Sequence, residues 1–240
     1  MIIVFIWWLY QCFIGIYNIK VWRKLYRKYQ KFDDDGMIGL CALYVFGCFT
    51  RCLFPKADVE RYTLIDSWIS SIFVGRSIAT IAEISFVYQW EYFIDNEIIT
   101  SLVVFLIYIA EICSWYGVLT LNFMGNIIEE SLWAASFFII SITMFIKGKY
   151  DLFIGTMLYV MFMVYVDVPM YISRLGSLHT MTIYEGFIDC NLRREVTWDF
   201  NHWKEEIPWQ TAYFTFAVWT SLYLTYKYCK SIELWHTKSE

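Results

Sequence analysis

Long apolar runs separated by short polar segments dominate the chain. A helix needs roughly 20 mostly apolar residues to cross a bilayer. We predict a transmembrane helix for each of seven runs, at about residues 2–17, 37–54, 64–88, 98–119, 127–146, 152–173 and 209–226. The first run has no basic leader, so we predict a retained span rather than a signal peptide. Residues 1–240 are therefore predicted to form one all-α integral membrane domain, a seven-transmembrane-helix bundle.

The polar segments between the runs predict the connections. Residues 121–125 and 147–151 are short, so the fourth, fifth and sixth spans should form antiparallel hairpins. The long segment 174–208 carries charges of both signs and is predicted to be a folded external loop. A weak internal similarity, in which Tyr44 matches Tyr159 and the segment Trp68 to Arg76 matches Trp219 to Lys227, suggests a 3+1+3 parallel repeat as a finer description.

Composition supports the membrane prediction and excludes other classes. The chain is 59% hydrophobic and 21% aromatic, with only 18% charged residues, and a soluble domain could not cover so much apolar surface. The net charge of -4 and the local clustering of basic residues exclude a nucleic-acid-binding surface. The expected partners are membrane lipids and, under one hypothesis, other membrane subunits.

Basic residues predict the orientation. Residues 18–36 contain six lysines and arginines, which the positive-inside rule places on the cytoplasmic side, or on the matrix or stromal side of an organelle. The C-terminus falls on the same side. The N-terminus and residues 174–208 are then outside.

No cofactor or metal site is expected. The three histidines lie outside the apolar runs, which excludes paired haem ligands in the membrane. The last run has no lysine before Lys227 at its end, which excludes a retinal Schiff base deep in that span.

Charged side chains inside a span are costly and mark the candidate site. At about 100° per residue, the polar side chains of segment 66–90 fall on one helix face within an arc of about 140°; they are Asp66, Ser70, Arg76, Ser77, Thr80 and Glu83. A buried arginine needs a carboxylate partner, and we expect Glu83 or Glu111. Two roles fit such a pair equally well: a structural ion pair that fixes helix packing, and a functional site.

Two further acids, Glu130 and Asp167, also lie in apolar sequence, and Pro169 is expected to kink the helix beside Asp167. Glu129 is assigned a structural role instead, because Asn126 three residues earlier would form a capping box with it.

A second candidate group precedes the last run. Asp199, His202 and Glu206 would share one side of a helix at spacings of three and four, as acid/base groups at the interface. The alternative is an ordinary aromatic belt, since Trp198, Trp203 and Trp209 surround them.

Three functions fit these patterns. The first is a small-solute, ion or proton transporter or channel, whose pathway is lined by Asp66, Arg76, Thr80, Glu83, Glu111, Glu130 and Asp167. The alternative is a membrane-embedded enzyme acting on a lipid or isoprenoid, with Glu130, Asp167, Asp199 or His202 as acid/base groups. The third is a non-catalytic subunit of a larger membrane complex. A lateral opening toward lipid near Asp167 and His202 would favour the enzyme. A water-accessible cavity that reaches Arg76 from one side would favour transport. A solid bundle whose acids all end in salt bridges would favour the subunit.

Overall fold

The computed structural model describes residues 1–33 and 35–239. The helical elements are α1 (Ile2–Tyr29), η1 (Gln30–Phe32), α2 (Met37–Leu53), η2 (Trp68–Ser70), α3 (Ile72–Ile94), α4 (Glu97–Thr120), α5 (Phe123–Ile146), α6 (Tyr150–Phe162), η3 (Met163–Asp167), α7 (Val168–Ser173), α8 (Ile183–Leu192), α9 (Phe200–Trp203), α10 (Glu206–Ala212), η4 (Tyr213–Ala217) and α11 (Val218–Ser239). Three two-residue strands, β1 (Lys56–Ala57), β2 (Tyr62–Thr63) and β3 (Glu195–Val196), form a small sheet in which β2 pairs antiparallel with β1 and parallel with β3.

The helices confirm an all-α fold compatible with a membrane protein. Among the described residues, four helices are long and apolar enough to cross a membrane by length and composition: Ile2–Phe32, Glu97–Thr120, Phe123–Ile146 and Tyr150–Ser173. The apolar helix Met37–Leu53 is shorter. The seven-span count therefore goes beyond these four helices.

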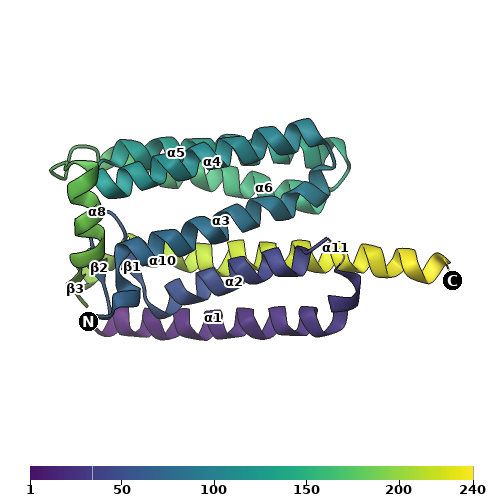
Figure 1. The fold of residues 1–240 in the computed structure, drawn as a ribbon, viewed down its shortest axis with the longest axis horizontal. Helices are drawn as coiled ribbons and strands as arrows, with labels where there is room; N and C mark the ends of the chain where they lie inside the picture. The colour runs from purple at the N-terminus through teal and green to yellow at the C-terminus, as the bar shows by residue number, and fades with distance from the viewer. Residues whose placement is uncertain (34, 240) are drawn as a thin grey trace.

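The long helices form two groups (Figure 1). One contains α4, α5 and α6, and the other contains α1, α2 and α11, with α3 lying between them. α11 packs against α1, α2 and α3, whereas α6 packs against α5. The main apolar core joins both groups and includes Tyr44, Phe86 and Phe137.

The connections gather at the two ends of the bundle. The N-terminus, the small sheet and α8 lie at one end, and α11 carries the C-terminus beyond the other (Figure 1). The basic stretch within residues 18–36 continues α1 as far as Tyr29 and then η1, so its side chains project from a helix. Residues 174–208 are folded, since they contain α8, β3 and α9.

The third predicted span begins later than expected. α3 starts at Ile72 because the Ser71 side chain caps it by accepting from the Val74 N–H at 3.3 Å. Asp66 lies before that helix and accepts a hydrogen bond from Arg194 Nε at 2.7 Å. The prediction that Asp66 and Ser70 share a helix face with Arg76 is therefore wrong.

The fifth span begins earlier than expected. Asn122 caps α5 by accepting from the Met124 N–H at 3.0 Å, which places Asn126 and Glu129 inside the helix. The predicted capping box between Asn126 and Glu129 is wrong. The purely structural role that the sequence assigned to Glu129 rested on this box and is therefore not supported.

Both helices that the sequence predicts around Asp167 and Tyr213 contain a π-helical turn. η3 ends at Asp167, two residues before Pro169, which has no N–H to continue the regular ladder. η4 begins at Tyr213, five residues after Pro208 in the same helical run. Such turns re-aim side chains and are frequent at functional sites.

Candidate functional site: an acidic cavity between two helices

A cavity of about 670 Å³ separates α6, η3 and α7 from α10, η4 and α11, with α2, α3 and α5 completing its wall. Leu158 and Phe216, one from each side of the cavity, line it and are 62% and 65% exposed, which indicates that the cavity opens between them. α6 and α11 make few close backbone contacts, and Asp151 on α6 bonds to Tyr223 and Lys227 on α11. We call this gap, between Leu158 on one side and Phe216 on the other, the lateral portal, because the cavity opens through it to the side of the bundle.

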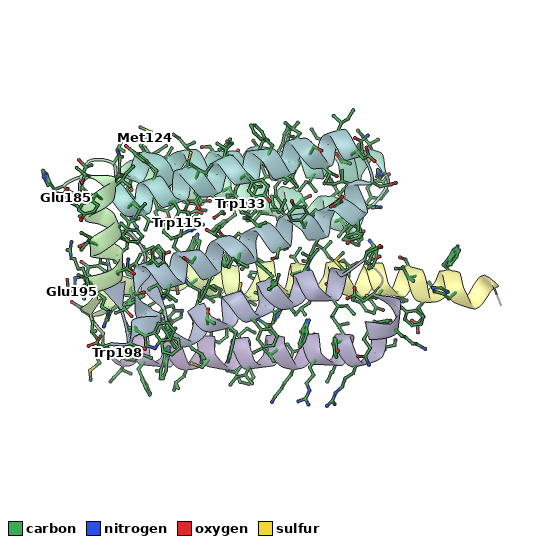
Figure 2. The ribbon with its side chains drawn as sticks, in the orientation of Figure 1. Trp115, Met124, Trp133, Glu185, Glu195 and Trp198 are labelled. Carbon is green, nitrogen blue, oxygen red and sulfur yellow. The ribbon has the colours of Figure 1, made fainter. Side chains whose placement is uncertain are left out.

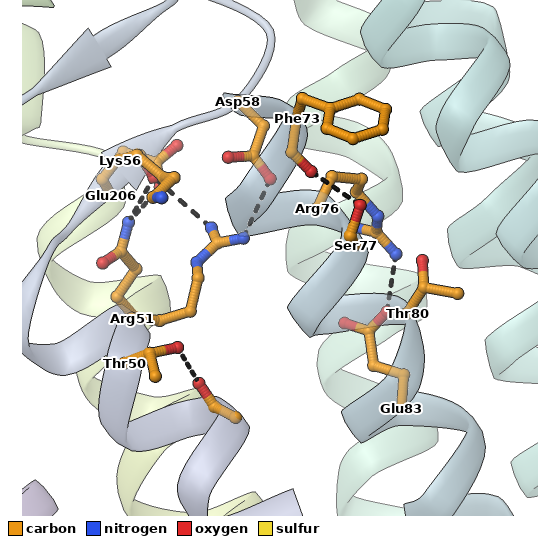
Figure 3. A network of polar contacts seen from close by, with 12 residues as sticks. Thr50, Arg51, Lys56, Asp58, Phe73, Arg76, Ser77, Thr80, Glu83 and Glu206 are labelled. Carbon is orange, nitrogen blue, oxygen red and sulfur yellow. Dashed lines mark hydrogen bonds and ion pairs between the residues drawn. The ribbon is translucent and has the colours of Figure 1, made fainter. Parts of the chain in front are cut away.

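Arg76 lies beside the cavity and holds three carboxylates. Its Nη2 is 2.6 Å from Glu83 Oε2, 2.8 Å from Glu111 Oε2 and 3.3 Å from Glu129 Oε1. The acids come from α3, α4 and α5, so the arginine ties α3 to α4 and α5. Figure 3 shows Arg76 bound to Glu83. The predicted pairing of Arg76 with Glu83 or Glu111 is confirmed, and both partners are used.

Neutral donors complete this cluster. Thr80 Oγ1 donates to Glu111 Oε2 at 2.7 Å and itself accepts from Trp115 Nε1 at 3.1 Å. Tyr213 OH donates to Glu83 Oε1 at 3.1 Å. Trp115 on α4 and Trp133 on α5 lie on the side of these helices that faces α3 (Figure 2).

The cavity has more acids than internal cations. Arg76 can balance one of the three carboxylates that it contacts, and Glu130 and Asp167 line the same cavity. Glu130 is 7% exposed, and no described residue pairs with its carboxyl or donates a hydrogen bond to it. Trp209 Nε1 donates to Asp167 Oδ2 at 3.1 Å, while Oδ1 is buried without a partner among the described residues. An unpaired ionised carboxylate in an apolar interior is costly, so the surplus acids must hold protons or face a cation from outside.

A metal ion is a less suitable partner for this cluster. Oxygens of Glu83, Glu111 and Glu129 lie within 4.8 Å of one another, a spacing that could hold an ion. Arg76 Nη2 already contacts all three carboxylates, so the guanidinium supplies the positive charge there.

The end of the cavity near the small sheet is a separate polar layer (Figure 3). Arg51 Nη1 pairs with Asp58 Oδ2 at 2.9 Å, and Gln210 Nε2 donates to the Lys56 carbonyl and to Glu206. Burial and the nearby Arg51 lower the pKa of Lys56 to about 7, and its Nζ donates to the carbonyls of Ile69 and Ser71.

Glu206 lies in the same layer, ahead of the predicted last span. Burial, followed by the charge of Glu60, raises the pKa of Glu206 to about 7. Arg174 pairs with Glu60 at 2.7 Å and with Glu205. Two arginines of this layer are therefore paired with acids, whereas Glu206 is held by Gln210.

The second candidate group from the sequence, Asp199, His202 and Glu206, does not form one site in the structure. Asp199 caps α9 by accepting from the Asn201 N–H at 3.1 Å, and His202 Nδ1 lies 3.1 Å from Thr197 Oγ1. Neither residue lines the cavity, whereas Glu206 does. The prediction that Asp199, His202 and Glu206 share one helix is wrong, because α9 ends at Trp203 and α10 starts at Glu206.

Of the predicted pathway residues, Arg76, Thr80, Glu83 and Glu111 form one cluster, and Glu130 and Asp167 line the adjoining cavity. Asp66 lies apart from them. Sequence reasoning missed Glu129 and Tyr213. Asn122, a preferred helix-capping residue four positions before Asn126, was the available signal for placing Glu129 inside the helix.

Comparisons with protein-family models, with curated proteins and with solved structures find no match for this chain. The functional argument therefore rests on the cavity. Its walls are mostly apolar and aromatic, and a few polar groups converge inside it, which is the usual character of a small-molecule site.

Proposed function

We propose that this protein is a membrane-embedded enzyme that transfers protons to and from a neutral lipid, such as an isoprenoid. The observation that carries the proposal is the unpaired Glu130 carboxyl on the wall of a cavity that opens sideways through the lateral portal. The geometry thus favours the second hypothesis from the sequence over transport.

The position of the portal supports a lipid substrate. Leu158 and Phe216 at its edges are apolar and exposed, as expected for surface that contacts acyl chains. A molecule dissolved in the bilayer can pass between these edges without crossing water. Aromatic and aliphatic side chains then receive its apolar body.

The charge of the cavity supports a substrate without an anionic group at this depth. Five acids, Glu83, Glu111, Glu129, Glu130 and Asp167, lie in or beside the cavity centre. Arg76 is already paired with three of them. A phosphate or carboxylate placed among them would meet like charge in a low dielectric.

Each polar group has a proposed role. Glu130 is the proposed proton donor to the substrate, and Asp167 is the second proton-transfer group. Trp209 is a positioning residue, since it holds Asp167 Oδ2. The Arg76 cluster fixes α3 against α4 and α5 and sets the field in the cavity.

The proposed topology is seven spans. The spans are α1, α2, α3, α4, α5, the run α6–η3–α7 and residues 209–226, which alternate in direction. By the positive-inside rule we propose that the N-terminus and residues 174–208 lie outside and that the C-terminus lies on the cytoplasmic, matrix or stromal side. The 3+1+3 repeat has little support: α11 packs on α1, α2 and α3, and Trp68 lies in η2 whereas its match Trp219 lies in α11.

Binding and turnover of a defined lipid test the proposal. Purified protein in nanodiscs is incubated with radiolabelled geranylgeraniol, and bound ligand and new products are measured by scintillation counting and mass spectrometry. We expect saturable binding and a product that Glu130→Gln abolishes. The exposed Glu91→Gln on α3 is the matched control and should behave like the unmodified protein. Absence of saturable binding would contradict the proposal.

Proton-coupled transport is the second candidate, favoured by two observations. Arg76 lines the cavity, as expected for a transport pathway. The cavity reaches from Glu206 near the small sheet to Asp151 near the opposite end of the bundle. Proton uptake into proteoliposomes under an imposed potential separates the two functions, because the enzyme should show none.

A further inference from the structure

One face of α5 carries an acid followed by aromatic rings. Glu130, Trp133 and Phe137 are three and seven residues apart, a spacing that stacks them on one side of a helix. All three line the cavity. The unpaired carboxyl therefore lies one turn from the first ring.

Phe137 is the centre of a larger ring cluster. Its centroid is 4.5 Å from Tyr159, 5.7 Å from Trp90, 5.8 Å from Trp133 and 6.0 Å from Phe86. Tyr44 stacks on Phe86 at 4.6 Å. We call this cluster the aromatic box; its members, all lining the cavity, are Tyr44, Phe86, Trp90, Trp133, Phe137 and Tyr159.

Ring faces and carboxylates attract the same kind of group. The electron-rich faces of aromatic rings attract cations, most strongly where water is excluded. The described residues offer Glu130 no cation of their own, since Arg76 is engaged with Glu83, Glu111 and Glu129. Acid and rings together form a place where a positive charge is stabilised and a negative charge is repelled.

We propose that Glu130 and the aromatic box form a binding site for positive charge, and that in the reaction this charge is a carbocation formed on an unsaturated isoprenoid. The inference rests on the proposed function, because the cation arises from its proton transfer. A quaternary alkylammonium ion carries the same charge permanently and is therefore a stable mimic of that intermediate.

The step balances without a further reagent. The O–H proton of the Glu130 carboxyl adds to one carbon of a C=C bond, and the π pair forms the new C–H bond. The neighbouring carbon becomes the cation, and Glu130 becomes the carboxylate. Loss of a proton from an adjacent C–H to the Glu130 carboxylate, directly or through Asp167, restores the Glu130 acid and a double bond. The net change is an isomerisation, or a cyclisation if a second double bond attacks the cation first.

Three chain-matched probes test the inference on the unmodified protein in nanodiscs. They are dodecyltrimethylammonium, dodecanol and dodecanoate, which share a twelve-carbon chain and differ in charge. Binding is read from quenching of tryptophan fluorescence, with protein-free nanodiscs correcting for partition into lipid. We expect the ammonium probe to bind about tenfold more tightly than the alcohol, and the carboxylate to bind least.

Variants assign the effect to this site. Glu130→Gln and the double variant Trp133→Leu/Phe137→Leu should each remove about tenfold of the preference for the ammonium probe while dodecanol binding persists. Phe138→Leu, a change on the same helix at a residue 47% exposed and outside the cavity lining, should leave the preference intact.

The outcomes separate the two proposals. Equal binding of the ammonium probe and the alcohol to the unmodified protein would overturn the positive-charge site and leave the lipid enzyme standing. Failure of all three probes and of geranylgeraniol to bind would overturn both. Persistent preference for the ammonium probe in a folded Glu130→Gln protein, with folding checked by its melting temperature, would overturn the role of Glu130.

Discussion

Trp209 and Asp167 join the two helices on either side of the lateral portal, since the indole Nε1 donates to Asp167 Oδ2 at 3.1 Å. Near the opposite end of the cavity, Tyr223 OH donates to Asp151 Oδ2 at 2.6 Å, and Lys227 pairs with the same carboxylate. Between these links α6 and α11 make few close backbone contacts. The width of the portal therefore depends on few polar contacts.

Breaking the first link should admit small molecules faster. Trp209→Phe removes the donor to Asp167, so the portal should open more often and expose Cys48, a buried cysteine on the cavity wall. We expect N-ethylmaleimide to modify Cys48 several-fold faster, measured by peptide mass spectrometry. Trp198→Phe, a change outside the cavity lining, is the control. An unchanged rate would show that the link does not limit access.

Removing Arg76 should damage folding more than removing one of its partners. Arg76→Leu leaves three buried carboxylates without their shared cation, for which we expect a loss of about 3–5 kcal/mol in unfolding free energy. Adding Glu83→Gln, Glu111→Gln and Glu129→Gln should restore most of the melting temperature in detergent micelles. If Arg76→Leu with Glu111→Gln alone restored it fully, the three-acid cluster would be contradicted.

A glycine at the contact between α8 and α4 gives a packing prediction. A Cβ on Gly186 would lie 1.7 Å from the Leu119 carbonyl oxygen, so Gly186→Ala must displace α8. We expect a loss of about 1–3 kcal/mol in unfolding free energy. Gly39→Ala is the matched control, because nothing lies within 4 Å of its added Cβ. Thermal unfolding of both variants checks the difference, and equal melting temperatures would contradict the close approach.

Two buried groups in the polar layer predict how stability depends on pH. Because the pKa of Glu206 is raised, its contribution to the free energy of unfolding is fully present below pH 4.5 and is lost as pH rises to about 7. Because the pKa of Lys56 is lowered, its contribution to the free energy of unfolding is fully present above pH 10.5 and is lost as pH falls to about 7. Together they should give a stability minimum near pH 7, read from melting temperatures across that range. Glu206→Gln should make the melting temperature independent of pH on the acidic side of the minimum. Lys56→Met should do the same on the alkaline side.

Cysteine labelling checks the topology. Membrane-impermeant maleimide should reach Glu185→Cys and Gln30→Cys, both exposed positions, from opposite sides of the membrane. Labelling of both from the same side would contradict the seven-span proposal.

The sequence predicted the apolar helices and the Arg76 pairing because both follow from local rules. Hydropathy alone predicted the helix Met37–Leu53 to within one residue at its end. The free-energy cost of a buried guanidinium predicted that Arg76 has a carboxylate partner such as Glu111. Helix starts were less predictable. Ser71 and Asn122 compete with other polar residues nearby as caps, and only the packed chain selects between them.

The cavity itself lay beyond sequence reasoning. Glu129 and Glu130 are neighbours in similar apolar surroundings, yet Glu129 reaches Arg76 while Glu130 faces the cavity unpaired. That difference depends on the rotation of α5 against α3, which no local pattern specifies. Tyr213 donates to Glu83 because η4 packs near α3, two segments that are far apart in the sequence.

Arg76 also determines how α3 can move against α4 and α5. Its guanidinium, on α3, pairs with Glu111 on α4 and with Glu129 on α5. A shift of α3 along its own axis would break both pairs at once and leave buried carboxylates without a cation, which is costly. The cluster therefore fixes the axial register of α3 in the bundle.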